Sequence, residues 1–299
     1  MTTASPSQVR SGPDKTLFGL IGSGIGRSLT PSLHEAEGAH LGMRVHYQII
    51  DLDRGRGGAS QLPMLFESAR VMGFAGLNIT FPCKQQVIEL LDDLSDDARA
   101  LGAVNTVVFD KAGRATGFNT DCFGWRESFR RKQPQADLSR VVLLGAGGAG
   151  SAVAHAVMQL GAEQLSIVDI DVQRAEQLAQ RVGRIHGQAR VKCTTLEDAM
   201  RDASGLIHAT PTGMDKLPGL PLSSSLLRSS MWVSDIVYFP LETELLRIAQ
   251  ALGCVTVDGG GMAVWQAVGA FAYFTGVTPD ADRMEAHFRR LVATPSRAG

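Results

Sequence analysis

The sequence predicts an α/β protein of two domains with a cleft between them, and three observations predict this class. The chain has 299 residues, enough for one large domain or two ordinary ones. Apolar runs typical of buried strands alternate with helix-like segments along its first half, which indicates a mostly parallel sheet. A glycine-rich motif that opens a second alternation begins only at Gly145, so a complete domain can precede it.

The first domain is expected to contain, in chain order, a strand at 17–22, a helix at 32–41, a strand at 45–50, a helix at 62–72, a strand at 76–79 and a helix at 84–91. Pro31 stands where it can start the first of these helices, since proline suits a first helical turn. Two further strands, 103–109 and 115–119, flank a turn at 111–113 and predict a hairpin.

The domain connection is placed at 123–139, a charged segment without a clear strand. The expected boundaries are a disordered polar leader at 1–15, a first domain at 16–122 and a second at 123–261. The second domain is expected to contain strands at 141–144, 165–168, 205–209, 232–237 and 255–257 and a helix at 243–252. Two final helices, 262–274 and 280–293, are expected to join the first domain.

The glycine motif follows an apolar strand and precedes a helix, which is the context of a dinucleotide fingerprint. In this fingerprint the first glycine permits a tight turn, the second lets the backbone approach a pyrophosphate, and the third allows close packing. A second strand ends at Asp169, where a carboxylate would accept hydrogen bonds from ribose hydroxyls. A merely flexible glycine loop would not explain that acid. The motif therefore predicts a Rossmann domain whose cofactor contacts are Gly145, Ala146, Gly147, Gly148, Ala149, Gly150 and Asp169.

Composition excludes several classes of partner. A net charge of −1 gives no electrostatic reason to expect nucleic acid or an anionic membrane. No apolar run approaches the roughly 18–20 residues of a membrane span. The four cysteines and seven histidines are scattered without metal-ligand spacing, so the expected protein is cytoplasmic, reduced and without a metal.

Polar residues gather at the strand ends of the first half, and each has an ordinary structural alternative. Ser28 and Thr30 could bind an anion or simply cap a helix. Lys84, after Asn78 and Thr80, could be a solvated surface charge. Asp121 could cap the following helix, and a buried Asn105 needs hydrogen-bond partners, of which a ligand is one candidate. The residues alone leave these alternatives open.

Eight motifs in order resemble the shikimate/quinate dehydrogenase family and span residues 17–290, nearly the whole chain. They are S-L-T-P-S-L-H (28–34), N-I-T-F-P-C-K (78–84), A-V-N-T (103–106), G-F-N-T-D (117–121), G-A-G-G-A-G (145–150), A-T-P-T-G-M (209–214), D-I-V-Y-F-P-L-E-T-E-L-L (235–246) and G-M-x-x-x-Q (261–266). Any one motif is weak evidence, but eight in this order are specific.

The resemblance implies an enzyme that transfers hydride between a nicotinamide dinucleotide and the ring 3-hydroxyl of shikimate or quinate. Lys84 and Asp121 would be the acid–base pair, because oxidising an alcohol requires a base for the hydroxyl proton. The implied substrate contacts are Ser28 and Thr30 for the carboxylate, Thr80, Asn105 and Gln266 for ring hydroxyls or neighbouring groups, and Tyr238 nearby. Thr210 and Gly259 would add contacts to the cofactor.

The same resemblance indicates which nicotinamide cofactor the protein prefers. NADP-preferring members carry an N-R-T-like segment after the second Rossmann strand, whereas this chain has Asp169, Ile170 and Asp171. A carboxylate there would accept the ribose 2′-hydroxyl and repel a 2′-phosphate, while Arg174 lies a turn further on, so we expect NAD in preference to NADP.

The substrate and the assembly stay open. Thr30 and the H-E-A-E-G segment at 34–38 resemble bacterial NAD-dependent quinate/shikimate enzymes. Shikimate, quinate or an aminoshikimate-like acid could be the substrate, and the chain could be a monomer or a homodimer. A non-catalytic ligand sensor is the other alternative, but such a protein would be expected to lose Lys84 or Asp121, and both are present.

Overall fold

A computed structural model describes residues 15–293, so the leader expected at the start of the chain lies outside the described residues except for Lys15, which begins the first strand. The first half contains β1 (Lys15–Gly22), α1 (Thr30–His40), β2 (Arg44–Asp51), α2 (Leu62–Val71), β3 (Phe74–Ile79), β4 (Asp93–Leu94), α3 (Asp96–Leu101), β5 (Thr106–Phe109) and β6 (Ala115–Phe118). The second contains α4 (Thr120–Lys132), β7 (Arg140–Leu144), α5 (Gly148–Gln159), β8 (Gln164–Val168), α6 (Val172–His186), β9 (Val191–Cys193), α7 (Leu196–Met200), β10 (Gly205–His208), β11 (Trp232–Asp235), α8 (Glu244–Ala251), β12 (Val255–Val257), α9 (Gly260–Thr275) and α10 (Ala281–Ala293).

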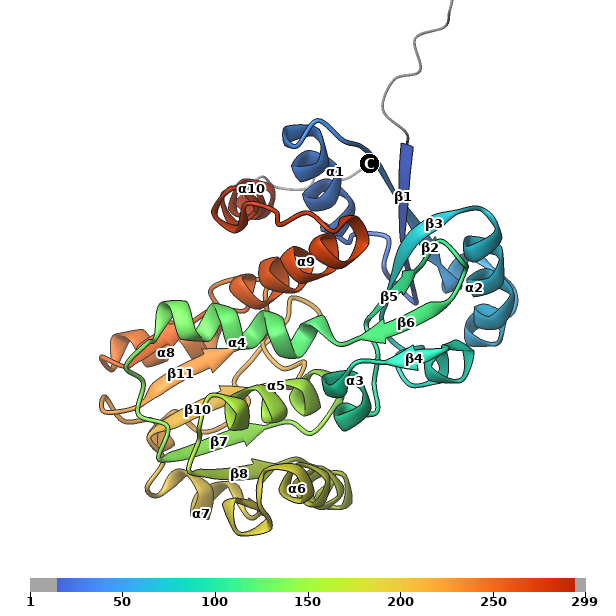
Figure 1. Cartoon of the computed structure of the whole chain (residues 1–299). Coiled ribbons are helices and arrows are strands. Elements are labelled where there is room, and N and C mark those ends of the chain that lie inside the picture. The colour runs from blue at the N-terminus through green and yellow to red at the C-terminus, as the bar shows by residue number, and fades with distance from the viewer. Residues whose placement is uncertain (1–14, 294–299) are drawn as a thin grey trace, which may run out of the picture.

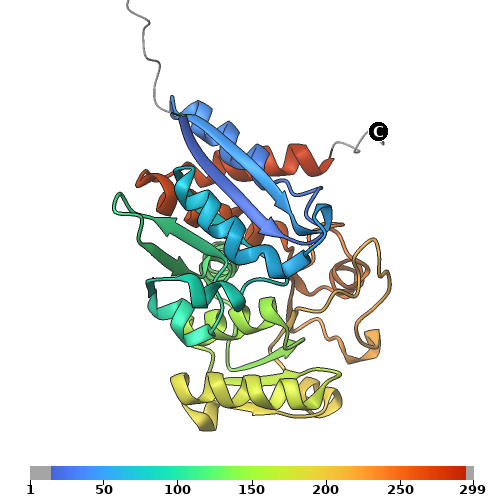
Figure 2. The ribbon, with the colours of Figure 1, turned by 90° about the vertical axis from the view of Figure 1, so that its right-hand side faces the viewer.

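Two six-stranded sheets confirm the predicted α/β class with two domains. The first has the strand order β2-β1-β3-β5-β6-β4 and is mixed, because β5 runs antiparallel to both β3 and β6 while the other pairs are parallel. The second, β12-β11-β10-β7-β8-β9, is parallel throughout, as expected for a Rossmann domain. Helix α4 crosses from one sheet to the other (Figure 1), and the blue strands of the first sheet and the yellow helix α6 lie at opposite ends of the molecule (Figure 2).

The helix predicted at 84–91 is wrong. Only a short 3-10 helix forms, Gln86–Leu90, and the chain then becomes extended at Leu91. The reason is tertiary: the N–H of Asp92 donates to the carbonyl of Ala115, and β4 pairs with β6. Sheet pairing therefore ends the helical turns that the apolar residues favour locally. This leaves Lys84 in a turn, where its carbonyl accepts a hydrogen bond from the N–H of Val104.

The last two helices pack on first-half elements. Rings of Phe271 and Phe274 lie 6.2 and 4.8 Å from that of Phe18 on β1. Gly76 on β3 leaves the space for this contact, since a Cβ there would lie 2.1 Å from the Phe274 ring. The domain boundaries stay a prediction, which this packing supports. Within residues 15–293 no helix is both long and apolar enough to cross a membrane.

A buried histidine in this aromatic cluster predicts a pH dependence of stability. His34 is fully buried among Phe18, Tyr47, Phe271 and Phe274, neither ring nitrogen has a hydrogen-bond partner within the described part of the chain, and burial lowers its pKa to about 3. Below about pH 6.5, His34 therefore binds a proton in the unfolded chain but stays neutral in the folded chain. The free energy of unfolding is highest above that pH and decreases as the pH falls below it.

We expect His34→Leu to reduce this acid sensitivity. Its free energy of unfolding should fall less steeply than that of the wild type below about pH 6.5, by up to about 1.4 kcal/mol per pH unit. Urea denaturation at pH 7.5, 6 and 5 measures the difference. Met64→Leu, at an exposed position without a titratable group, is the control and should keep the wild-type slope. Equal slopes for His34→Leu and the wild type would refute the assignment.

Candidate active site

The centre of the site is an ion pair between Lys84 and Asp121. Lys84 Nζ lies 2.5 Å from Asp121 Oδ2, and the two side chains are 23% and 13% exposed. Lys84 follows β3 in the first sheet, whereas Asp121 lies in the first turn of α4. The pair is thus partly shielded but open to a ligand. This geometry rejects the alternative that Lys84 is a solvated surface charge.

Asp121 is free for this contact because its neighbour caps the helix. The side chain of Asn119 accepts from the N–H of Cys122, and its amide donates to the carbonyl of Ala103. Asn105 fixes the same turn, since its Oδ1 accepts from both the N–H and the hydroxyl of Thr120. The oxygen of buried Asn105 is therefore engaged, and its Nδ2 amide is the group left for a ligand among the described residues.

Two hydroxyls converge at the start of α1. Ser28 Oγ donates to Thr30 Oγ1 at 3.0 Å and accepts from the N–H of Thr30. No side chain caps α1 at its N-cap residue, Leu29. The start of α1 therefore offers two hydroxyls at the positive end of a helix, an arrangement suited to a carboxylate. Thr80 lies at the end of β3, where its Cγ2 would be 2.2 Å from a Cβ on Gly22, so that glycine is required for the close approach.

Residues from the second half complete this neighbourhood. Tyr238 follows β11 and is 42% exposed, and burial and, to a lesser extent, the charge of Asp121 raise the pKa of its hydroxyl. Gln266 lies on α9, which crosses α4 closely at Gly124: a Cβ on Gly124 would lie 2.7 Å from the backbone nitrogen of Gln266. The glycine brings Gln266 toward the helix that carries Asp121.

The glycine loop has the geometry expected of a phosphate site. Gly145 has a φ of +110°, and a Cβ on Gly150 would lie 2.0 Å from the carbonyl oxygen of Gly145. By contrast, a Cβ on Gly147 or Gly148 would meet nothing within 4 Å, so open space faces the start of α5. Gly145 thus makes the tight turn, Gly150 allows the close packing, and Gly147 leaves space for the ligand, as the motif predicts. The loop fits a dinucleotide pyrophosphate.

Asp169 lies beside this loop at the end of β8. Its Oδ2 accepts from the N–H of Ala146 at 2.6 Å and its Oδ1 from the N–H of Asp171. Ile170 is fully exposed, and Arg174 pairs with Asp171 at 3.6 Å. A ribose bound at this edge therefore meets a fixed carboxylate, while the nearby arginine is directed to another acid.

A buried polar network that no sequence motif indicated lies behind the cofactor loop. His208 Nδ1 lies 2.9 Å from Asp235 Oδ1, and both residues are buried. The other ring nitrogen contacts Thr210 Oγ1 at 2.5 Å, and Thr243 donates its hydroxyl to Asp235 Oδ2. Parallel register sets His208 directly opposite Asp235 on β10 and β11. In the sequence, this network could have been inferred only from a histidine and an aspartate that each end an apolar strand.

This network positions the loops that carry Thr210 and Gly259. Thr210 follows β10, and its hydroxyl also accepts from the N–H of Thr212. Gly259 lies against the chain after β11, where a Cβ would be 2.4 Å from the carbonyl oxygen of Ile236. Both predicted cofactor residues are thus at the same end of the second sheet as the glycine loop.

We expect Thr243→Val to lower the free energy of unfolding by about 2 kcal/mol. The change leaves one oxygen of buried Asp235 unsatisfied and also removes the hydroxyl that caps α8 at Leu246. Thr195→Val is the matched control, because Thr195 caps α7 but its hydroxyl contacts only exposed Asp198. Urea denaturation should give a loss for Thr243→Val at least twice that for Thr195→Val. Equal losses would show that the buried bond contributes nothing.

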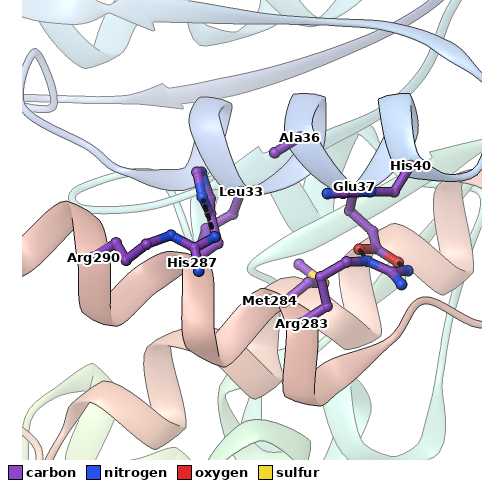
Figure 3. A pocket seen from close by; sticks show the side chains of 8 residues that line it. All are labelled: Leu33, Ala36, Glu37, His40, Arg283, Met284, His287 and Arg290. Atoms are coloured by element: carbon purple, nitrogen blue, oxygen red, sulfur yellow. Dashed lines mark hydrogen bonds and ion pairs between the residues drawn. The ribbon is translucent and has the colours of Figure 1, made fainter.

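A small cavity between α1 and α10 is not part of this site. It has a volume of about 20 Å³, room for about one water, and Figure 3 shows the Glu37 and Arg283 side chains directed toward one another beside it. Three hydrogen bonds hold the buried Glu37 carboxylate, two from Arg283 and one from the N–H of Asp280. The cavity therefore borders a structural ion pair that joins the first helix to the last.

Together, the Rossmann loop and the lysine–carboxylate pair define a dinucleotide-dependent oxidoreductase of two domains. Family comparisons agree with this class. Residues 20–107 match the shikimate dehydrogenase substrate binding domain, residues 127–214 match shikimate/quinate 5-dehydrogenase, and residues 259–287 match the shikimate 5′-dehydrogenase C-terminal domain. The chain belongs to the shikimate/quinate dehydrogenase family, as its motifs predicted.

Its relatives differ in cofactor. A shikimate dehydrogenase (NADP⁺) of Streptomyces avermitilis is 55% identical, over 94% of this chain and 97% of the relative. A quinate/shikimate dehydrogenase (NAD⁺) of Corynebacterium glutamicum is 45% identical, over 93% and 99%. Among solved structures, a quinate dehydrogenase from Corynebacterium glutamicum in complex with NAD has a TM-score of 0.89 at 44% identity, covering 93% of this chain and all of that one. A nicotinamide dinucleotide is thus supported as cofactor.

Proposed function

We propose that this enzyme oxidises the ring 3-hydroxyl of shikimate, quinate or both, reversibly and with NAD as the preferred cofactor. The observation that carries the proposal is the 2.5 Å contact between Lys84 Nζ and Asp121 Oδ2. A catalytic pair of this kind must lie within hydrogen-bonding distance of the proton that it moves.

The roles of the residues follow from their chemistry. A bound NAD would accept the hydride that leaves the ring carbon. Within the pair, Lys84 Nζ takes the proton that leaves the hydroxyl oxygen, and Asp121 orients this nitrogen and offsets the positive charge. In the reverse direction Lys84 returns this proton to the oxygen.

Other residues fix which hydroxyl reaches the pair. Ser28 and Thr30 bind the substrate carboxylate, so the ring is held through a group two ring positions away from the reacting carbon. Thr80, the Asn105 amide and Gln266 lie at strand and helix positions that can contact ring hydroxyls, with Tyr238 nearby. Such positioning is a large part of the rate enhancement expected of a site that orients its substrate.

NAD is favoured by the carboxylate at Asp169. Its oxygens retain lone pairs for the ribose hydroxyls after accepting from Ala146 and Asp171. A 2′-phosphate would approach this carboxylate and would find exposed Ile170 in place of a cation. Because a 55% identical relative is an NADP⁺ enzyme by name, the two cofactors are compared directly.

Initial rates with NAD and NADP, each against shikimate and quinate, test the proposal. We expect turnover with at least one of the two acids and kcat/KM at least about 10²-fold higher with NAD than with NADP. Absence of turnover in all four combinations would refute it and would favour an aminoshikimate-like substrate or a non-catalytic sensor.

A further inference from the structure

A cluster of potential metal ligands lies outside the candidate active site. Asp97 Oδ1, Cys122 Sγ and His155 Nε2 all lie within 4.8 Å of one another, and this is the one such group of three among residues 15–293. The three residues are far apart in the sequence, which is why their spacing predicted no metal site. The fold brings them together where α3, α4 and α5 meet.

The ligands come from both halves of the molecule. Asp97 lies in the first turn of α3, Cys122 in α4 and His155 in α5 of the Rossmann domain. Cys122 and His155 are buried, whereas the Asp97 side chain is 33% exposed. The cluster is therefore shielded from water on the cysteine and histidine side and reachable from solvent on the carboxylate side.

Surrounding residues already hold these ligands in place. Gln159 donates its amide to Asp97 Oδ1 at 2.8 Å, and its Oε1 accepts both from the Cys122 thiol at 3.7 Å and from the Arg126 guanidinium. The same amide nitrogen lies 3.1 Å from His155 Nε2. The second ring nitrogen of His155, Nδ1, lies 2.8 Å from His186 Nε2.

Two proton arrangements fit these histidine contacts. In one, His155 Nε2–H donates to Asp97 and Nδ1 accepts from His186. In the other, Nδ1–H donates to His186, and the Nε2 lone pair faces the carboxylate, the thiol and the Gln159 amide. The second arrangement is the one in which a metal-binding imidazole is normally held by an outer partner.

We propose that Asp97, Cys122 and His155 form a site for a divalent transition metal of the Zn²⁺ or Co²⁺ type, with a water as the fourth ligand on the exposed side of Asp97. Thiolate, imidazole and carboxylate are the donors that such ions prefer, and one thiolate with one carboxylate neutralises the charge of the ion. Binding breaks the S–H bond of Cys122 and releases its proton to solvent while the metal–sulfur bond forms; no electron is transferred.

Metal binding requires the three ligand atoms to move closer together. Ligand atoms around a tetrahedral ion lie about 3.3–3.6 Å apart, as metal–ligand bonds of about 2.0–2.3 Å dictate. Asp97 Oδ1 and His155 Nε2 already lie 3.3 Å apart. Separations of up to 4.8 Å must therefore shorten by about 1 Å, and the Gln159 amide that now bonds Asp97 must turn away.

Titration of the full chain with Co²⁺ under reducing conditions tests the proposal. We expect a near-ultraviolet thiolate-to-Co²⁺ charge-transfer band that saturates at one ion per chain, and a rise in Tm with Zn²⁺, because a ligand that binds the folded state stabilises it. The band should be absent in Cys122→Ser and retained in Cys193→Ser, a control that removes a more exposed thiol. Circular dichroism checks that each variant is folded.

Two further variants retain the Cys122 thiol, and they distinguish loss of a metal ligand from misfolding. Asp97→Asn and His155→Gln should each weaken Co²⁺ binding at least about 10-fold. The proposal is overturned if the wild type gives no band, if the band survives in Cys122→Ser, or if both of these variants bind Co²⁺ as tightly as the wild type. None of these readouts depends on turnover, so the result stands whether or not the proposed reaction is correct.

Discussion

Replacing Lys84 by alanine is expected to lower kcat at least about 10²-fold for whichever of shikimate and quinate the enzyme oxidises. The reason is that the hydroxyl proton loses its acceptor while the glycine loop and Asp169, more distant in the chain and on the other domain, are unchanged. The dissociation constant for the dinucleotide should change less than about 3-fold. Steady-state kinetics and a fluorescence titration with the dinucleotide measure the two quantities separately.

Lys132→Ala is the matched control for this experiment. Lys132 also forms an ion pair, with Asp258 at 3.1 Å, and lies at the other end of the helix that carries Asp121. Loss of that pair should leave kcat within about 3-fold of the wild type. A Lys84→Ala enzyme with nearly normal kcat would rule out Lys84 as the base, whatever the control gives.

The second large effect concerns the cofactor. The double variant Asp169→Asn, Ile170→Arg is expected to shift the ratio of kcat/KM for NAD over NADP by about 10³-fold toward NADP. The change removes a carboxylate that repels the 2′-phosphate and supplies a guanidinium that can bind it, and each charged contact is worth about 1.5–3 kcal/mol. Asparagine keeps one acceptor oxygen, which can still accept from the N–H of Ala146, and loses the oxygen that accepts from the N–H of Asp171.

Asp171→Asn separates this effect from a general loss of negative charge. Asp171 lies two residues further on, caps α6 and pairs with Arg174, and asparagine can still cap the helix. Its cofactor ratio should stay within about 3-fold of that of the wild type. Comparable kcat/KM with both cofactors in the wild type, or an equal shift in Asp171→Asn, would contradict the role given to Asp169.

Local signals predicted the Rossmann half well. The glycine turn, the following helix and Asp169 are set by residues close together in sequence, so each could be recognised without the rest of the fold. The helix expected at 84–91 failed for the opposite reason. Its apolar residues favour helical turns, but the pairing of β4 with β6, distant in sequence, decides where the chain goes.

The site itself depends on contacts between distant residues. Sequence position alone could not distinguish Asp121 as a helix cap from Asp121 as a partner of Lys84; the capping bond of Asn119 decides it. The pairing of His208 with Asp235 requires knowing that β10 and β11 are neighbours in register. Asp97, Cys122 and His155 carry no motif, because three separate helices bring them together.

The most direct test of the central claim follows the hydrogen that leaves the ring. Shikimate and quinate carrying deuterium at carbon 3 are incubated with the enzyme and NAD, and the reduced dinucleotide is analysed by mass spectrometry. We predict that the reduced dinucleotide acquires one deuterium from at least one of these acids. Reduced dinucleotide without deuterium, or no reduction with either acid, would contradict oxidation at the 3-hydroxyl.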